Sequence, residues 1–219
     1  MLKRLFDICF ALTLLFVAAP TLLLCAILIK LESPGPVLFV QNRMGRGFRV
    51  FRLYKLRTMA CGVQGLHYTV GGDPRITRLG AWLRRMKLDE FPQLINVLRG
   101  EMSIVGPRPV VPQIALDFRR EYEVLLGVRP GLTDPASLKY CRESELLALV
   151  PDPIAYFETV VTPEKLRISR EYMQRANAVK DVGLILRTAL AVIDTTVHPH
   201  KLRQFAARQS AANPQGDAG

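Results

Sequence analysis

Two adjacent carboxylates stand among basic residues in the first half of this 219-residue chain. Asp89 and Glu90 precede Phe91-Pro92 and an apolar stretch, a pattern typical of the first turn of a helix. A carboxylate at this position can attack phosphorus and form an acyl phosphate, while its neighbour holds a hard cation such as Mg²⁺. The positive end of the helix dipole would favour the ionised acid and a bound phosphate. Plain helix capping also explains the two acids, and residue type and spacing alone favour it.

Basic side chains around this pair could hold phosphate groups, whose charge calls for Arg, Lys and Mg²⁺. Arg108 lies between Pro107 and Pro109, and the restricted backbone would aim its guanidinium with little loss of entropy. A surface arginine in a proline-rich loop would need no such role. The other candidates for phosphate binding are Arg43, Lys55, Arg57 and Arg75. A serine or cysteine nucleophile has no support, because the sequence contains no Gly-x-Ser-x-Gly motif and no histidine within 37–59 or 75–110.

The positive charge is concentrated where the chain is also most apolar. The formal net charge is +11; residues 1–110 hold 16 basic and 6 acidic residues, against 14 and 13 in residues 111–219. A cationic and apolar half indicates a membrane surface, an anionic substrate or both. Nucleic-acid binding is disfavoured, since the basic residues accompany an apolar segment and no recognition motif is present. The four cysteines lack CxxC spacing, which argues against a zinc site or a disulfide framework and favours a reducing compartment.

The apolar segment runs from Ile8 to Ile29, 22 residues without a charge. As a helix it would be about 33 Å long, enough to cross a bilayer, and it is too long for the apolar part of a signal peptide. Pro20 near its middle would kink the helix and could fold it back, so that both ends lie on one side. Basic residues flank both ends and favour the cytoplasmic side for each. Physical reasoning gives a spanning and a re-entrant helix equal weight, and a buried core helix less.

Periodicity downstream predicts a small hairpin and then a basic helix. The apolar run at 37–40, the turn at 44–47 and the alternation over 48–56 together predict a β-hairpin. Apolar positions at helical spacing predict an amphipathic helix over 75–87, whose arginine-rich face carries Trp82. Such a face suits a membrane interface, and it suits an ordinary packed helix equally well. At a membrane, the charges expected to contact anionic headgroups are those of part of this helix and Lys3, Arg4 and Lys30.

The second half carries fewer chemical signals. Helices are predicted at 141–149, 163–176 and 181–197, the last of them amphipathic. Residues 103–109 and 128–131 are predicted as turns. His198 and His200 lack a nearby carboxylate, so they are a weak signal for a metal.

In their order and spacing, these segments resemble the bacterial sugar transferase family, the monotopic phosphoglycosyl transferases, over roughly residues 1–200. The most specific block runs from Leu88-Asp89-Glu90-Phe91-Pro92-Gln93 to Gly100 and ends at Gly106-Pro107-Arg108-Pro109. Further matching motifs are Lys3-Arg4-Leu5-Phe6-Asp7, Ser33-Pro34-Gly35-Pro36-Val37, Gln41-Asn42-Arg43-Met44-Gly45, Phe51-Arg52-Leu53-Tyr54-Lys55-Leu56-Arg57-Thr58-Met59 and Asp73-Pro74-Arg75-Ile76-Thr77-Arg78-Leu79-Gly80.

The resemblance implies an activity and roles for the acidic pair. Members transfer a phosphosugar from a UDP-sugar to polyprenyl (undecaprenyl) phosphate and release UMP, the first membrane step of glycoconjugate assembly. It implies that Asp89 is the nucleophile and forms a covalent aspartyl-phosphosugar, that Glu90 helps to bind Mg²⁺ and that Arg108 contacts phosphate. Lys55, Arg57, Arg75 and Arg43 remain the further candidates for substrate binding.

The resemblance also implies the architecture and the location. We expect an α+β, mainly helical fold, with a re-entrant membrane helix (1–30) broken at Ala19-Pro20, a small β-hairpin and amphipathic interfacial helices. A catalytic domain (31–200) and a flexible tail (201–219) follow. The protein would be a short-form, monotopic member at the cytoplasmic face of the bacterial inner membrane. Its expected partners are the UDP-sugar, polyprenyl phosphate and membrane lipid, without nucleic acid; a homodimer is left open.

Two segments depart from the family pattern. Ala19-Pro20 replaces the common Ser-Pro at the helix break, and Leu132–Ser137 replaces a Gly-x-x-Gln pattern. The angle of the break and the identity of the sugar are therefore not transferred. A non-enzymatic, membrane-anchored basic protein that binds anionic lipid is the alternative function, and release of UMP from UDP-sugars distinguishes the two.

Overall fold

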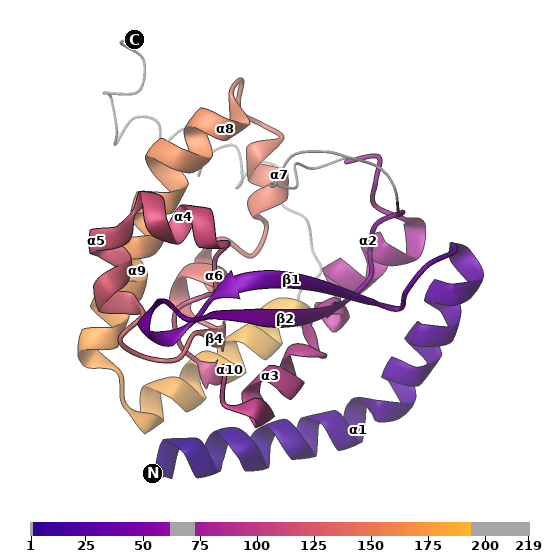
Figure 1. Ribbon diagram of the computed structural model, residues 1–219, viewed down its shortest axis with the longest axis horizontal. Coiled ribbons are helices and arrows are strands. Elements are labelled where there is room, and N and C mark those ends of the chain that lie inside the picture. The colour runs from indigo at the N-terminus through magenta and orange to yellow at the C-terminus, as the bar shows by residue number, and fades with distance from the viewer. Residues whose placement is uncertain (1, 62–72, 194–219) are drawn as a thin grey trace.

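The computed structural model describes residues 2–61 and 73–193, and in it a long N-terminal helix lies along a mainly helical domain (Figure 1). The helices are α1 (Leu2–Glu32), α2 (Arg78–Arg85), α3 (Gln93–Arg99), α4 (Pro112–Asp117), α5 (Arg119–Leu125), α6 (Pro135–Lys139), α7 (Glu143–Leu147), α8 (Pro153–Tyr156), α9 (Thr162–Arg175) and α10 (Ala178–Ile193). The strands are β1 (Leu38–Met44), β2 (Val50–Leu56), β3 (Ser103–Val105) and β4 (Gly131–Thr133). β1 and β2 form an antiparallel hairpin, while β3 and β4 form a parallel pair. The expected α+β, mainly helical class is confirmed.

α1 exposes apolar side chains around most of its circumference. Its buried residues form one stripe that faces the domain: Asp7, Ala11, Ala18, Cys25 and Ile29. Within its most apolar 18-residue window, 17% of the residues are buried. By length and composition α1 could cross a membrane. Large apolar side chains left uncovered over such a surface are typical of a helix in contact with lipid.

α1 continues through Pro20 and bends instead of breaking. The helix is assigned without interruption from Leu2 to Glu32. In Figure 1 its N-terminal half runs beneath α3 and its C-terminal half turns up toward α2. A proline removes one helical hydrogen bond and crowds the preceding turn, which bends a helix without necessarily ending it. The expected interruption of the helix at Ala19-Pro20 is therefore not observed, and the helix bends there without ending.

The N-terminal turn of α1 is fastened to the domain by two basic side chains. Lys3 Nζ lies 2.9 Å from Oδ2 of Asp181 in α10. Arg4 donates to the carbonyl oxygens of Val97 and Leu98, at 2.6 and 3.0 Å, where α3 ends. A cation on the last carbonyls of a helix satisfies acceptors that have no partner within the helix. Both side chains are thus engaged within the protein, and their expected contact with lipid headgroups stays a prediction.

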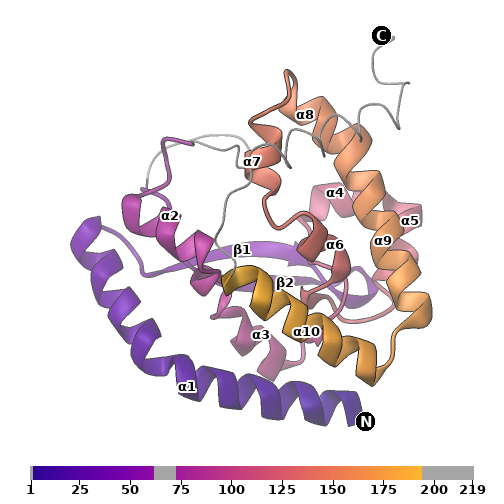
Figure 2. The same cartoon turned by 180° about the vertical axis from the view of Figure 1, so that it is seen from behind.

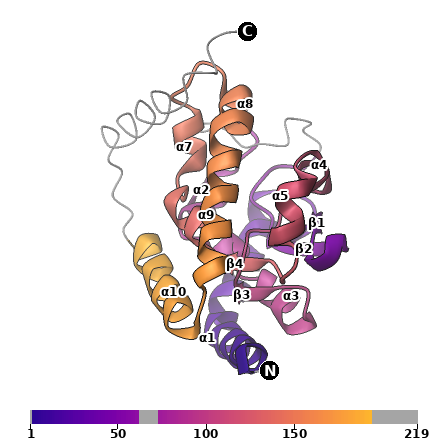
Figure 3. The ribbon, with the colours of Figure 1, turned by 90° about the vertical axis from the view of Figure 1, so that its left-hand side faces the viewer.

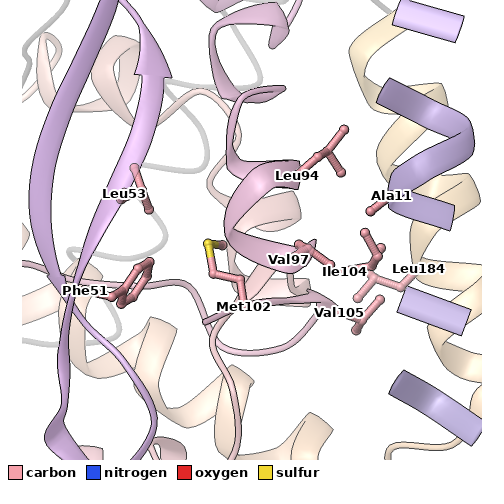
Figure 4. Packing of buried hydrophobic residues seen from close by; sticks show 9 residues of the cluster. All are labelled: Ala11, Phe51, Leu53, Leu94, Val97, Met102, Ile104, Val105 and Leu184. Carbon is pink, nitrogen blue, oxygen red and sulfur yellow. The ribbon is translucent and has the colours of Figure 1, made fainter. Parts of the chain in front are cut away.

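The main core lies between α1, the hairpin, α3 and α10 (Figure 4). Nine buried residues form it: Ala11, Phe51, Leu53, Leu94, Val97, Met102, Ile104, Val105 and Leu184. Burial of each large side chain contributes about 1.5–3 kcal/mol. This core fixes α3 and β3, the two elements next to the acidic pair and the Pro-Arg-Pro loop.

β3 and β4 approach each other through glycines. Ser103 pairs with Gly131, and Val105 pairs with Thr133. A Cβ on Gly131 would lie 2.1 Å from the nitrogen of Gly106, so no larger residue fits there. The parallel pair was not predicted, because three-residue strands show no periodicity, and the segment 103–109 was expected to be a turn throughout.

Of the helices in the second half, α4, α5 and α9 pack with Met44 of β1 in a second core, whereas α10 joins the main core. Figure 2 shows α10 crossing in front of the hairpin above α1, and Figure 3 shows α9 beside α10. The hairpin and the helices predicted at 75–87, 141–149 and 163–176 are confirmed in β1–β2, α2, α7 and α9, with shifted ends. The helix predicted at 181–197 is confirmed in α10 as far as the described residues extend, to residue 193. Residues 62–72, the pair His198 and His200, and the tail lie outside the described residues.

Candidate active site

A short 3₁₀ turn, Leu88–Glu90, carries the acidic pair into α3. It follows Lys87, whose φ of 55° puts a non-glycine residue in the left-handed region. Such a conformation costs on the order of 1–3 kcal/mol and is found most often at functional sites. α3 begins at Gln93 and ends at Gly100, whose φ is 80°. The helix predicted to follow the two acids is confirmed, and the acids lie in the turn just before it rather than in its first turn.

Glu90 is held by basic side chains from two other segments. Arg108 Nη1 donates to Oε2 at 3.1 Å, and its Nη2 donates to Oε1. Lys55 of β2 lies with its Nζ 3.5 Å from Oε1. Burial by itself would raise the pKa of Glu90, but the charges of Arg108 and Lys55 lower it well below its ordinary value. At neutral pH Glu90 is therefore a carboxylate, and it fixes two cations beside Asp89.

Asp89 is buried and incompletely bonded. It is 6% exposed, and its Oδ1 has no hydrogen-bond partner among the described residues. Burial raises the pKa of Asp89 and the charge of Glu90 raises it further, while Lys55, Lys87 and Arg84 act in the opposite direction. A buried acceptor without a partner is destabilising, and native proteins keep few of them. The oxygen of Asp89 is thus available for a ligand or for chemistry.

Asn96 of α3 aligns the hairpin with the acidic turn. Its Nδ2 donates to the carbonyl oxygen of Arg52 at 2.7 Å and to Glu101 Oε2 at 2.6 Å. Its Oδ1 accepts from the backbone nitrogen of Tyr54 at 3.2 Å. Lys55 follows Tyr54 directly, so these bonds set where its side chain leaves the strand. The residue was not singled out from the sequence, since an amide on an apolar helix gives no signal of its partner.

Arg43 of β1 is a further cation near this cluster. Its Nη2 donates to Gln41 Oε1 at 2.7 Å, and its buried Nε has no partner among the described residues. Burial and the charge of Arg108 lower the pKa of Arg43 to about 10, against the opposing effect of Glu90. The structure therefore brings Arg43, as well as Lys55 and Arg108, into the electrostatic surroundings of the acidic pair.

Arg57 holds the C-terminal end of α1 instead of facing the acids. It donates to the carbonyl oxygens of Ile29 at 3.2 Å and Ser33 at 2.7 Å, and also to that of Pro34. Its side chain is buried, with 5% of the residue exposed. The candidate role of Arg57 in substrate binding is not supported by this placement. Arg57 follows the last residue of β2, so the strand's alternation does not aim it as it aims Lys55.

Arg75 is bonded away from the acidic pair, whereas Arg84 lies within its electrostatic influence. Arg75 grips Asp73, with Nε 2.9 Å from Oδ1 and Nη2 2.6 Å from Oδ2. Arg84, on the basic helix α2, donates from Nε to Thr58 Oγ1 at 2.8 Å. Burial lowers the pKa of Arg84, and the charge of Asp89 opposes that shift. Its position five residues before Asp89 was the available signal that it belongs with the acidic pair.

The donor set fits a magnesium ion that is held by few protein ligands. Within residues 2–61 and 73–193, no group of three or more His, Cys, Asp or Glu could hold a metal. Mg²⁺ commonly binds through one or two carboxylates and leaves its other positions to water and substrate phosphates. Asp89 Oδ1 is unpaired and suits such an ion. Glu90 could join it by sharing oxygens that Arg108 and Lys55 now hold.

Taken together, this arrangement is suited to a substrate with several negative charges. Lys55 and Arg108, from two different segments, contact Glu90, and the charge of Arg84, from a third segment, acts on the pKa of Asp89. Clustered cations stabilise phosphate oxygens as charge develops on them. A carboxylate with a free oxygen among them is placed to act as a nucleophile toward phosphorus.

Comparisons with known proteins give a consistent result. A family model described as bacterial sugar transferase matches residues 1–195. The exopolysaccharide production protein PSS of Rhizobium leguminosarum bv. phaseoli is 47% identical over 150 residues, which cover 64% of this chain and 75% of that protein. The UDP-glucose:undecaprenyl-phosphate glucose-1-phosphate transferase of Caulobacter vibrioides is 39% identical over 199 residues, covering 88% of this chain and 70% of that protein. An undecaprenyl-phosphate glucose phosphotransferase of Komagataeibacter xylinus is 45% identical over 149 residues, covering 64% of this chain but 28% of that protein.

Proposed function

This chain belongs to the bacterial sugar transferase family, and we propose that it transfers a phosphosugar from a UDP-sugar to polyprenyl phosphate with release of UMP. The reaction would be the first membrane step in the assembly of a glycoconjugate. The names of the Caulobacter and Komagataeibacter relatives, which specify undecaprenyl phosphate, support the acceptor. The observation that carries the proposal is the buried Asp89, whose unpaired oxygen lies next to a glutamate clamped by Arg108 and Lys55.

Asp89 is the nucleophile in this mechanism. Its carboxylate oxygen attacks the β-phosphorus of the UDP-sugar, and the bond from that phosphorus to the bridging oxygen breaks. UMP leaves with the bonding electrons, and the phosphosugar remains on Asp89 as an acyl phosphate. A phosphate oxygen of polyprenyl phosphate then attacks the same phosphorus. This second displacement forms the lipid diphosphate sugar and regenerates the carboxylate.

Arg108 and Lys55 stabilise the charge of the diphosphate during both displacements. Both are already oriented by Glu90, so little reorganisation is needed when a phosphate takes over part of their hydrogen bonding. Arg43 adds a third positive charge near Arg108. Arg57 and Arg75 have no part in this mechanism, since they hold the end of α1 and Asp73.

Asp89 and Glu90 would also hold Mg²⁺. When bound, the ion would neutralise part of the charge on the diphosphate and make its phosphorus more electrophilic. The support for this is the unpaired Oδ1 of Asp89 together with the adjacent carboxylate.

We place α1 in one leaflet of the bacterial inner membrane, with the domain at the cytoplasmic face. Arg4 in its first turn donates to the end of α3, and Arg57 of the domain donates to a carbonyl oxygen in its last turn, which supports a helix that enters and leaves by one face. The bend near Pro20 (Figure 1) gives the change of direction that such a path needs. Exposed apolar residues on α10 add a second surface that lipid could cover: Val179, Val182, Leu186 and Leu190.

Release of UMP tests the activity. Membranes containing the protein are incubated with Mg²⁺, undecaprenyl phosphate and each member of a panel of UDP-sugars. We expect release with at least one sugar, and a loss of about 1,000-fold or more in Asp89→Asn, which removes the nucleophile. Asp117→Asn is the matched control, because Asp117 is an exposed acid on α4. Absence of release with every sugar, or full activity in Asp89→Asn, would favour the non-enzymatic lipid-binding alternative.

Two further measurements test the intermediate and the topology. Without acceptor, the intact mass of the wild-type protein should rise by one phosphosugar, and that of Asp89→Asn should not.

Tags at the two ends of the chain should be reached by the same membrane-impermeant reagent from the same side. Access from opposite sides would contradict the re-entrant helix and leave the chemistry standing.

A further inference from the structure

Asp7 is a buried acid in the second turn of α1, directly before the apolar run of that helix. It is 2% exposed, and the next acidic residue along the chain is Glu32. Ser103 Oγ lies 3.0 and 2.9 Å from its two carboxylate oxygens and donates to them. The backbone nitrogen of Ile104 donates to Oδ1 at 3.0 Å. A buried carboxylate is strongly unfavourable unless it is bonded in this way, so the contact between α1 and β3 is specific in geometry.

The strand that Asp7 holds leads directly to Arg108. After Ser103 and Ile104, the chain passes through Val105, Gly106 and Pro107 and reaches the guanidinium that clamps Glu90. On its other side this segment is tied to β4: Ser103 N donates to the carbonyl oxygen of Pro130 at 2.9 Å, and Gly106 N to that of Thr133 at 3.1 Å. Short strands held on both sides, followed by a proline, leave the arginine little freedom.

The same end of α1 also holds the helix that follows the acidic turn. Arg4 donates to the last carbonyls of α3, and α3 begins three residues after Glu90. Ala11, one turn beyond Asp7, packs in the core with Leu94 and Ile104 (Figure 4). α1 is therefore bonded to both segments that meet at the Glu90–Arg108 pair, and Asp7 makes the most buried of these bonds.

We propose that Asp7 is a positioning residue for phosphosugar transfer: through Ser103 and Ile104, its carboxylate sets the position of Arg108 against Glu90 and makes that position depend on the seating of the membrane helix. This inference rests on the proposed function. The side chain touches neither the acidic pair nor Arg108 in the structure, so it acts through β3. Its removal shifts the arginine that stabilises the transferred phosphate and leaves the nucleophile in place.

The test compares Asp7→Ala with two other variants in the full chain, reconstituted in lipid nanodiscs. Asp7→Ala should lower kcat for UMP release by about 10- to 100-fold, the loss expected from a small misplacement of a catalytic group, with a much smaller change in KM. Asp7→Asn should recover most of kcat, because its amide can accept from Ile104 N and donate to Ser103 Oγ. Lys3→Ala, which breaks the bond between α1 and α10, should keep wild-type kcat.

A second readout separates positioning from general damage. Hydrogen exchange should quicken in peptides covering residues 103–108 in Asp7→Ala, and it should not in Lys3→Ala. If Asp7→Ala does not fold, Ser103→Ala replaces it and should show the same change in kcat and in exchange, only smaller. The inference is overturned if kcat stays at the wild-type level, if Asp7→Asn is as impaired as Asp7→Ala, or if kcat falls without faster exchange. A wild-type protein that releases no UMP overturns the proposed function as well.

Discussion

Two clusters in this molecule each join one glutamate to two basic residues, and they differ in burial and in hydrogen bonding. Glu90 is bonded to Arg108 and Lys55, and Glu164 of α9 is bonded to Lys139 and Arg167. The bases lower the pKa of the glutamate in both, that of Glu164 to about 2, chiefly through the hydrogen bond from Arg167.

The clusters differ in what lies beside them. The side chain of Arg167 is 56% exposed, and the cluster of Glu164 forms an outer seam between α6 and α9. Glu90 instead adjoins Asp89, a buried acid with an unpaired oxygen. An exposed cluster with satisfied groups contributes little to stability or chemistry, whereas a buried cluster that leaves one acid unsatisfied indicates a site. The burial of the charged groups and the presence of an acid without a hydrogen-bond partner, more than residue type, therefore distinguish a functional site from a surface ion-pair cluster.

Removing one arginine from each cluster should give the largest contrast. Arg108→Ala should reduce UMP release about 100- to 1,000-fold, since it removes a donor that stabilises the transferred phosphate. Arg167→Ala should stay within about twofold of wild type, because its guanidinium is exposed and is bonded to Glu164 and Glu171 of its own helix. Initial rates at saturating UDP-sugar measure both. Equal losses in the two variants would remove the distinction between the clusters.

A substitution in the β3–β4 pair, which precedes Arg108 in the chain, should give the next largest effect, a loss of stability. Gly131→Ala should destabilise the fold by about 1–3 kcal/mol or more, because its Cβ would collide with Gly106 across the β3–β4 pair. Gly183→Ala on α10 is the matched control: its Cβ would meet nothing within 4 Å, and alanine favours a helix by about 1 kcal/mol. Thermal unfolding of the two proteins should shift in opposite directions. A Gly131→Ala protein as stable as wild type would contradict the close approach of these strands.

Much of this architecture could be predicted from the sequence, and the exceptions share a cause. The long helix has an uncharged run of 22 residues, and the hairpin and the basic helix have periodic patterns, so their prediction succeeded. Lys55 and Arg57 look equivalent in sequence, but the structure sends one to Glu90 and the other to the carbonyls that end α1. The bond from Asp7 to Ser103 joins residues 96 positions apart, and no local pattern reveals such a pair. Contacts between distant segments decide which charged residues form the site.

The fall in UMP release at acidic pH should depend on the buried cluster around Glu90 and not on the exposed cluster around Glu164. Burial and Glu90 raise the pKa of Asp89, and Lys55 opposes the rise, so activity should fall as acidification protonates the nucleophile. Lys55→Met removes a charge that favours the carboxylate and should move this acid limb to higher pH, measured on the remaining activity. Lys139→Met, in the exposed cluster, should leave the limb unchanged. A limb that stays in place in Lys55→Met would mean that Asp89 does not control it.

Glu164→Gln should have the smallest effect, and its pH dependence has a definite sign. The folded protein holds the pKa of Glu164 at about 2, below its ordinary value of 4.5, so ionisation of this acid favours folding. That contribution is present above the ordinary pKa and is lost as the pH falls through the folded value. Because the partners are partly exposed and screened by solvent, the loss in Glu164→Gln at pH 7 should remain under about 1 kcal/mol and shrink in high salt. Urea unfolding at pH 7 and at about pH 2 should therefore show a small difference that narrows on acidification, with UMP release unchanged. A loss of activity in this variant would show that the outer seam between α6 and α9 takes part in the reaction.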